Sequence, residues 1–324
     1  MVRRRAAMAL VAGVAMLPVL PIHAQVWPDK PIKVIVPFPL GGGGDNMARL
    51  VMSRVATELG QPMVFENLAG AGGNLGSVTA SKAAPDGYTF LYGTNGTFGI
   101  NQSLYKKPGF SAVNDFEHVS RLTTIAAMVV VRPNFPAQSM TELLKLLKAN
   151  PGKYTFASAG NGTTSHMAGE TLKSAANLAV VHIPYRGGAP AITDVIGGQI
   201  DFMIDVMPNT APQVKGGRLR ALAVSTGSRV PGFETIPTIA ESGVPGFDVS
   251  AWDGIFAPAG TPTAVIEKMN AAIRKVLSVP EFQKQLAERG SVAAPNSPQE
   301  HRAFVKSEVE RWSQVVKRSG ASVD

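Results

Sequence analysis

The stretch from Val34 to Gly76 constrains the fold more than any other, because a strand, a glycine loop and an amphipathic helix follow one another directly. The segment 32–36 is apolar and β-branched, which is typical of a buried strand. Four glycines at 41–44 follow, and apolar residues then recur at helical spacing over 47–59. The first amides of such a helix have no intrahelical acceptor, and the helix dipole favours an anion beside them. The stretch therefore predicts a strand–loop–helix unit suited to binding an anion.

Two more turns of this kind follow the next two predicted strands. Residues 63–65 lead into a turn at 69–73, and residues 88–92 lead into a turn at 93–96. Because the carboxyl ends of parallel strands meet at one edge of a sheet, these turns are expected to form one crevice. A turn at 158–164 repeats the pattern in the second half of the chain. Facing turns in two domains would hold an anion from both sides, whereas isolated turns would bind nothing.

The order of the predicted elements indicates an α/β protein with two domains. Strands and helices alternate, and a long apolar run at 116–131 predicts a strand that crosses into a second α/β unit. A strand at 249–256 predicts the return, and the next helix is expected to begin with Thr261 as its N-cap. We therefore predict a first domain of residues 25–124 and 252–324, a second domain of residues 125–251, and a ligand cleft at the hinge.

Residues 1–24 are predicted to be a signal peptide. Arg3, Arg4 and Arg5 precede a short apolar segment, and Ala24 offers a small residue for cleavage. The apolar segment is shorter than the roughly 20 residues that span a bilayer. We therefore expect export to the periplasm and not a membrane anchor.

Composition excludes several kinds of site. The 324-residue chain has no cysteine, which excludes disulfides, thiolate metal sites and a cysteine nucleophile. The net charge of +8 includes three leader arginines, and the other basic residues are scattered along the chain. A nucleic-acid partner is not expected from this distribution. No Gly-Lys-Ser/Thr follows the glycines at 41–44, which excludes a Walker A phosphate loop.

One alternative function is that of an exported hydrolase, in which Ser158 or Ser165 acts with His166 and Asp205. The sequence lacks a G-x-S-x-G nucleophile elbow, and Ser165 immediately precedes His166 in a predicted helix. A histidine that braces its loop is therefore favoured over a catalytic one. We predict no catalytic residue, no metal site and no cofactor.

Other side chains each allow two interpretations. Asp45 either caps the helix that it begins or contacts a ligand ammonium group, and the cap is favoured. Tyr185 and Arg186 follow a strand, and Arg186 either binds a ligand carboxylate or pairs with a surface acid. Trp252 either lines the cleft or packs the hinge. Asp205 ends a strand, where it either accepts a hydrogen bond from a ligand or caps the next helix.

An ordered set of motifs extends along the whole mature chain. The motifs are WPDKPIKVIVPFPLGGGGD, NLAGAGGNLG, APDGYT, SAGNGTTSH, HIPYRGGAPA, GGQIDFM and FAPAGTP. Together with the predicted signal peptide, this set resembles the Bug receptors, which are TctC-like periplasmic solute-binding proteins of tripartite tricarboxylate transporters. The resemblance implies a two-domain periplasmic binding-protein fold, type II-like, that closes around a small mono-, di- or tricarboxylic acid.

The resemblance also implies which residues bind the ligand, largely through backbone amides and ordered waters. These residues are Pro39, Leu40, Gly41, Gly42, Ala71, Gly72, Gly73, Ser158, Ala159, Gly160, Asn161, Gly162, Thr163 and Thr164. Polar residues after predicted strands add Thr94, Tyr185, Arg186 and Asp205. The implied partners are the carboxylate ligand and membrane permease subunits, and we expect a monomer. Besides the hydrolase, a ligand-sensing receptor that feeds a signalling partner stays open.

Overall fold

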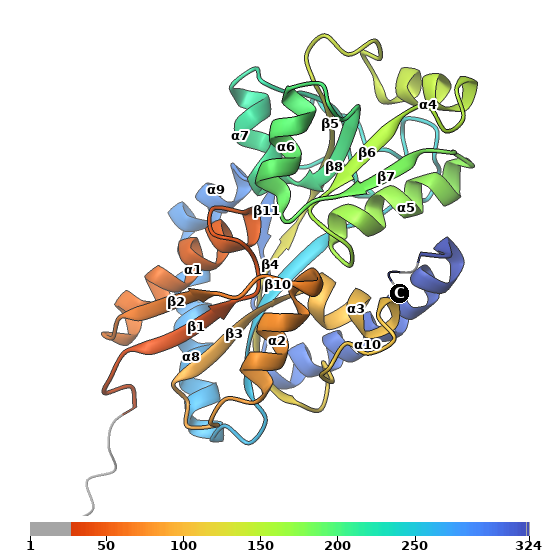
Figure 1. Ribbon diagram of the computed structural model, residues 1–324. Coiled ribbons are helices and arrows are strands. Elements are labelled where there is room, and N and C mark those ends of the chain that lie inside the picture. Colours follow the sequence, from red (N-terminus) through yellow and green to blue (C-terminus); the bar gives the residue numbers. More distant parts are fainter. Residues whose placement is uncertain (1–26, 322, 324) are drawn as a thin grey trace, which may run out of the picture.

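The computed structural model describes residues 27–321 and 323, and the predicted signal peptide lies outside them. It contains two β-sheets covered by helices (Figure 1). The strands are β1 (Ile32–Val36), β2 (Met63–Asn67), β3 (Thr89–Thr94), β4 (Phe116–Ile125), β5 (Ala127–Val131), β6 (Thr155–Ser158), β7 (Val181–Pro184), β8 (Phe202–Val206), β9 (Arg220–Val224), β10 (Ala251–Pro258) and β11 (Ser291–Ala293). The helices are α1 (Gly43–Leu59), η1 (Ala71–Gly73), α2 (Asn74–Ser81), η2 (Gly96–Ile100), α3 (Asn101–Leu104), α4 (Met140–Ala149), α5 (Thr164–Ala176), α6 (Gly188–Ile196), α7 (Met207–Lys215), α8 (Thr263–Leu277), α9 (Pro280–Ala287) and α10 (Pro298–Ser319).

The first sheet has six strands in the order β11-β4-β10-β3-β1-β2. β1 pairs in parallel with β2 and β3, whereas β10 runs antiparallel to β3 and β4. Helices α1, α8 and α9 pack on one face, and α2, η2 and α10 pack on the other. Val34 and Val36 therefore face α1 while Ile35 faces the opposite layer, which explains why β1 is apolar without alternation.

The second sheet has five strands in the order β7-β6-β8-β5-β9. β6 pairs in parallel with β7 and β8, and β5 runs antiparallel to β8 and β9. Helices α4 and α5 pack on one face, and α6 and α7 pack on the other. Trp312 and Val316, near the end of α10, belong to the same core cluster as α4 and α5. The last helix therefore contacts both the six-stranded half and the five-stranded half of the protein.

The chain passes between the two sheets twice. Ala126 alone separates β4 in the six-stranded sheet from β5 in the five-stranded sheet. The chain returns through the segment 225–250, which leads into β10. The apolar run at 116–131, predicted as one strand, is therefore two strands in different sheets. The domain limits at residues 124 and 252 stay a prediction.

Asp253 joins three strands next to the crossing. It is fully buried in β10 and accepts hydrogen bonds from the Thr123 backbone N–H at 2.8 Å, the Thr123 hydroxyl at 2.6 Å and the Tyr92 hydroxyl at 2.6 Å. Burial raises the pKa of Asp253, and these hydrogen bonds oppose that effect. The network holds β3, β4 and β10 together where the chain changes sheets.

The helix ends agree with the sequence in one case and differ in another. Ser139 caps α4, as serine commonly does at a helix start, since its hydroxyl accepts from the Glu142 N–H at 3.2 Å. The prediction for Thr261 is wrong: α8 begins at Thr263, and the Thr261 hydroxyl donates to the Pro258 carbonyl in the preceding turn.

Among residues 27–321, no helix combines the length and the apolar character needed to cross a membrane.

Candidate ligand-binding site

A cavity of about 90 Å³ lies between the six-stranded and five-stranded halves. Its wall consists of residues that follow β1, β2, β3, β6 and β7, the ends of β4 and β8, and the starts of α7 and β10. One water molecule needs roughly 10–15 Å³ of such space, so the cavity has room for a small organic molecule. The predicted site residues that line it are Pro39, Gly42, Gly72, Thr94, Ala159, Thr163, Thr164 and Asp205.

The other predicted site residues do not line this cavity. They are Leu40, Gly41, Ala71, Gly73, Ser158, Gly160, Asn161, Gly162, Tyr185 and Arg186. Arg186 is exposed, and the Tyr185 hydroxyl donates to Asp194 at 2.5 Å. The next two residues, Gly187 and Gly188, line the cavity instead. A ligand-binding role for the outlying residues stays a prediction.

Several lining residues were missed by the sequence reasoning. They are Phe38, Gly43, Gly44, Met47, Tyr92, Asn95, Gly96, Ile125, Ser165, Gly187, Gly188, Val206, Pro208, Asn209 and Ala251. Asn95 had a visible signal, because it lies in the polar turn after the third predicted strand. Trp252 lines the cavity, as one of its two interpretations expects, and its Nε1 donates to buried Glu308 at 2.7 Å.

Asp45 braces the first glycine loop and does not cap α1. Its buried carboxylate accepts from the Gly41 N–H at 2.9 Å, from Arg49 Nε at 2.8 Å and from Asn67 Nδ2 at 2.9 Å. The helix begins at Gly43, and its N-cap, Gly42, has no side chain to accept from the first turn. The first amides of α1 therefore have no intrahelical acceptor at the cavity wall, where Gly43 and Gly44 lie.

The loop between β6 and α5 is held by its own side chains. Thr163 caps α5 by accepting from the His166 N–H at 3.3 Å, and its hydroxyl donates to the Gly160 carbonyl at 2.7 Å. His166 Nδ1 accepts from the Gly162 N–H at 3.3 Å, as expected for a histidine that braces its loop. The start of α5 is thereby fixed against the cavity, which Thr163 and Thr164 line.

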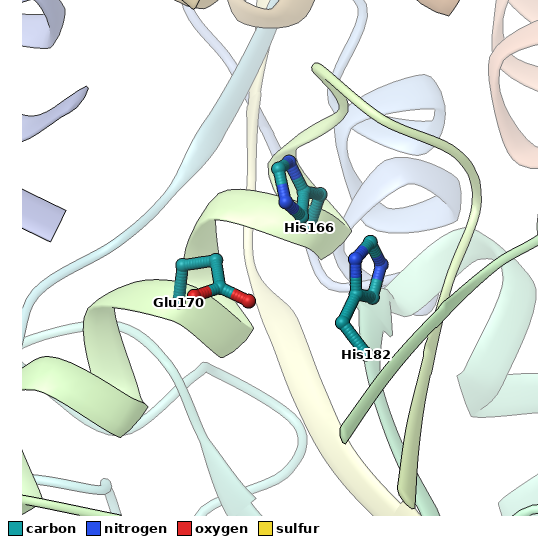
Figure 2. Close-up of side chains that lie close together, drawn as sticks. All are labelled: His166, Glu170 and His182. Carbon is teal, nitrogen blue, oxygen red and sulfur yellow. The ribbon is translucent and has the colours of Figure 1, made fainter. Parts of the chain in front are cut away.

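His166, Glu170 and His182 form a polar cluster next to this loop (Figure 2). One ligand atom of each residue lies within 4.8 Å of the others, and the two imidazole rings stack with centroids 4.5 Å apart. Burial lowers the pKa of both histidines, that of His182 to about 3, so both rings are neutral at pH 7. Since His166 Nδ1 accepts from Gly162, the proton of its neutral ring is on Nε2. A metal at Nε2 would have to displace this proton to Nδ1 and break the loop hydrogen bond.

The two candidate serine nucleophiles bond to other groups and not to His166. Ser158 Oγ lies 2.7 Å from His182 Nε2, and Ser165 Oγ donates to the Ile204 carbonyl at 2.6 Å. Activation of a serine requires a base within hydrogen-bond reach that is oriented by a third group. Asp205, the proposed third member, accepts instead from Asn209 Nδ2 at 2.8 Å. The triad considered from the sequence is therefore not assembled in this arrangement.

Among the residues that the structure describes, no lysine, arginine or histidine lines the cavity. Its one carboxylate is Asp205, which is buried, and burial raises its pKa to about 6 although Asn209 and the Val206 backbone donate to it. An anion in this cavity would therefore depend on backbone amides, hydroxyls and side-chain amides. Asp205 would oppose the anion wherever it is ionised.

The two halves touch across the cavity. Thr164 Oγ1 of the five-stranded half donates to Asn95 Oδ1 of the six-stranded half at 2.8 Å. Beside it, the Tyr105 hydroxyl donates to the Asn161 carbonyl at 3.4 Å. Farther along, Lys215 Nζ donates to the Glu288 carbonyl at 3.0 Å. These bonds join α5, its preceding loop and α7 to the opposite half. The cleft between the two halves is therefore closed in this structure.

Comparison with known proteins identifies relatives over most of the chain. The model of the family described as "Tripartite tricarboxylate transporter family receptor" matches residues 47–321. The periplasmic binding protein BugD is 36% identical, with a TM-score of 0.87 over 91% of this chain and 99% of BugD. MatC from Rhodopseudomonas palustris, solved with bound malate, is 33% identical, with a TM-score of 0.84 over 90% of this chain and 100% of MatC. Another R. palustris protein, solved with adipate, is 32% identical, with a TM-score of 0.89 over 91% of this chain and 99% of that protein.

Proposed function

Because the chain belongs to the tripartite tricarboxylate transporter receptor family, we propose that its cavity binds a small organic acid. Members of this family are solute-binding receptors. The observation that supports a carboxylate is that α1 and α5 both begin at the cavity wall. Helix N-termini offer backbone amides and the positive end of the dipole to an anion. The relatives solved with malate and adipate support a dicarboxylate as the first ligand to test.

Binding without a lysine or arginine is energetically reasonable. A hydrogen bond to a charged group contributes roughly 1.5–3 kcal/mol. Four such bonds give about 6–12 kcal/mol before the cost of ordering the ligand and the two halves. Micromolar affinity requires about 8 kcal/mol. Amides, hydroxyls and the two helix termini would therefore suffice.

The biological role that we propose is capture of the acid in the periplasm and delivery to permease subunits in the membrane. The family description and the periplasmic relative BugD support this role. We further propose that the receptor acts as a monomer and does not turn the ligand over. The second point is supported by the two candidate serines: Ser158 lies outside the cavity wall, and the Ser165 hydroxyl donates to the Ile204 carbonyl.

Titration calorimetry with paired ligands tests the proposal. Malate, adipate, a monocarboxylate and a tricarboxylate would each be compared with the neutral amide of the same acid. We expect at least one acid to bind one-to-one, and its amide to bind far more weakly because the charge is lost. Equal affinity for acid and amide, or binding of none of the acids, would contradict the proposal. Recovery of the unchanged acid after incubation would separate a receptor from a hydrolase.

A further inference from the structure

Asn95 presents a hydrogen-bond donor that is unused within the part of the chain that the structure describes. The residue follows β3 at the start of η2, is fully buried and lines the cavity. Its Oδ1 accepts from Thr164 Oγ1 at 2.8 Å. Its Nδ2 is buried and has no hydrogen-bond partner within residues 27–321. Buried polar groups nearly always have a partner, so an unused donor at a cavity wall indicates a missing acceptor.

Asn209 provides a comparison within the same wall. It also lines the cavity, but its Nδ2 already donates to Asp205 at 2.8 Å. Of these two asparagines, only Asn95 has an Nδ2 without any partner among the described residues. The Thr164 hydroxyl occupies the oxygen side of the Asn95 amide, which leaves the NH₂ side for another partner.

The surroundings of Asn95 favour a negatively charged acceptor. A Cβ at the adjacent Gly96 would lie 3.7 Å from Thr163 Cα and 2.9 Å from the Gly162 carbonyl oxygen. The turn that carries Asn95 therefore packs against the beginning of α5, a helix of 13 residues. The positive end of the helix dipole is located there. An oxygen atom bonded to Asn95 Nδ2 would benefit from this end of the helix.

We propose that Asn95 donates from Nδ2 to a carboxylate oxygen of the bound acid and links binding to closure of the cleft. This inference rests on the proposed function and assigns one residue to it. Thr164 belongs to the opposite half, so it orients the Asn95 amide only when the two halves meet. The ligand and Thr164 then occupy the two sides of one amide. A bound acid would thereby favour the closed arrangement.

Asn95→Asp tests the proposal with almost no change in shape. The aspartate keeps an oxygen that can accept from Thr164, but it replaces the donor by a second oxygen and adds a negative charge. With malate and adipate as probes in titration calorimetry, we expect at least about 100-fold weaker binding. Asn95→Ala loses the donor without adding charge, and about 10- to 150-fold weaker binding is expected from the loss of one charge-assisted hydrogen bond.

Two further variants make the test specific. Thr164→Val keeps the Asn95 donor but removes the bond that orients it, and a smaller loss than for Asn95→Ala is expected. Asn150→Asp is the matched control, because Asn150 ends α4 outside the cavity and its Nδ2 donates to the Leu146 carbonyl. Its affinity should equal that of the wild type. Thermal melts show whether each variant is folded. If Asn95→Asp is not folded, Asn95→Ala serves as the test of the Asn95 donor.

The outcomes separate this inference from the proposed function. If the wild type binds neither malate, adipate nor any other acid of the ligand series, the proposed function fails and this inference fails with it. If the wild type binds an acid and folded Asn95→Asp binds it within about threefold, only the role of Asn95 is overturned. Tighter binding by Asn95→Asp would show that the ligand presents a donor, such as an ammonium group, at this position, and would also overturn the proposal.

Discussion

Replacing Gly72 by alanine is expected to weaken ligand binding by preventing full closure. Gly72 lies in η1 with φ of +63°, and an added Cβ would lie 2.4 Å from the Asn161 carbonyl oxygen in the opposite half. Real Cβ atoms essentially never approach another heavy atom within 3.0 Å. A backbone carbonyl cannot rotate away as a side chain does, so the overlap is relieved by separating the halves.

The expected loss of affinity comes from this overlap and not from the backbone. An alanine in the left-handed region costs about 1–2 kcal/mol, but the cost is present in both the open and the closed protein and does not change affinity. The overlap exists only in the closed protein, and overpacking of this kind costs about 1–3 kcal/mol. Binding should therefore weaken about 5- to 150-fold.

Gly60→Ala is the matched control for Gly72→Ala. Gly60 ends α1 with φ of +69° and ψ of 17°, close to the values of Gly72, and an added Cβ meets nothing within 4 Å. Both variants should lose similar stability in thermal denaturation, but only Gly72→Ala should lose affinity for malate or adipate in calorimetry. Equal affinities for the two variants would refute the argument that the Gly72–Asn161 contact belongs to the ligand-bound state.

Three further variants test the site. Burial raises the pKa of Asp205 to about 6, so carboxylate binding should strengthen as pH falls from 7 to 6, where ordinary ligand carboxylates stay ionised, and Asp205→Asn should flatten this dependence in calorimetry. The pKa of Asp205 in the folded protein lies above the usual 3.8. Its contribution to the free energy of unfolding therefore falls by about 3 kcal/mol as pH rises from about 4 to 6. Denaturant titrations of Asp205→Asn should not show this decrease. Trp252→Phe should remove most of any ligand-dependent fluorescence change, because Trp252 lines the cavity and Trp312 lies in a core cluster; a surviving signal would argue against it. Arg186→Ala should change affinity less than threefold, since Arg186 is exposed and outside the cavity wall; a tenfold loss would contradict that placement.

The sequence predicts the strand–turn–helix units of this protein well, because their signals are local. The apolar run of β1, the glycines before α1 and the small residues before α5 each identify a turn at the end of a parallel strand. The crossing at Ala126 was predicted less well, since one apolar run supplies strands to two sheets. Nothing in its periodicity marks the residue at which the chain changes sheets.

Which residues of a turn face the cavity could not be predicted in the same way. In the first loop, Gly41 donates to Asp45 while Gly43 and Gly44 line the cavity. After β7, the charged Arg186 lies at the surface and the glycines that follow it line the cavity. These outcomes depend on dihedral angles and on contacts with the opposite half, which residue types and spacing do not specify. Asn95 was missed for the same reason, although its turn was identified.

A crystal structure of the protein with the tightest-binding acid would show directly which groups hold the ligand. We expect carboxylate oxygens within hydrogen-bond distance of the first amides of α1 and α5, with Asn95 Nδ2 as a donor and no lysine or arginine in contact. An acid held by Arg186 at the surface, or one bound elsewhere while the cavity contains only water, would contradict it.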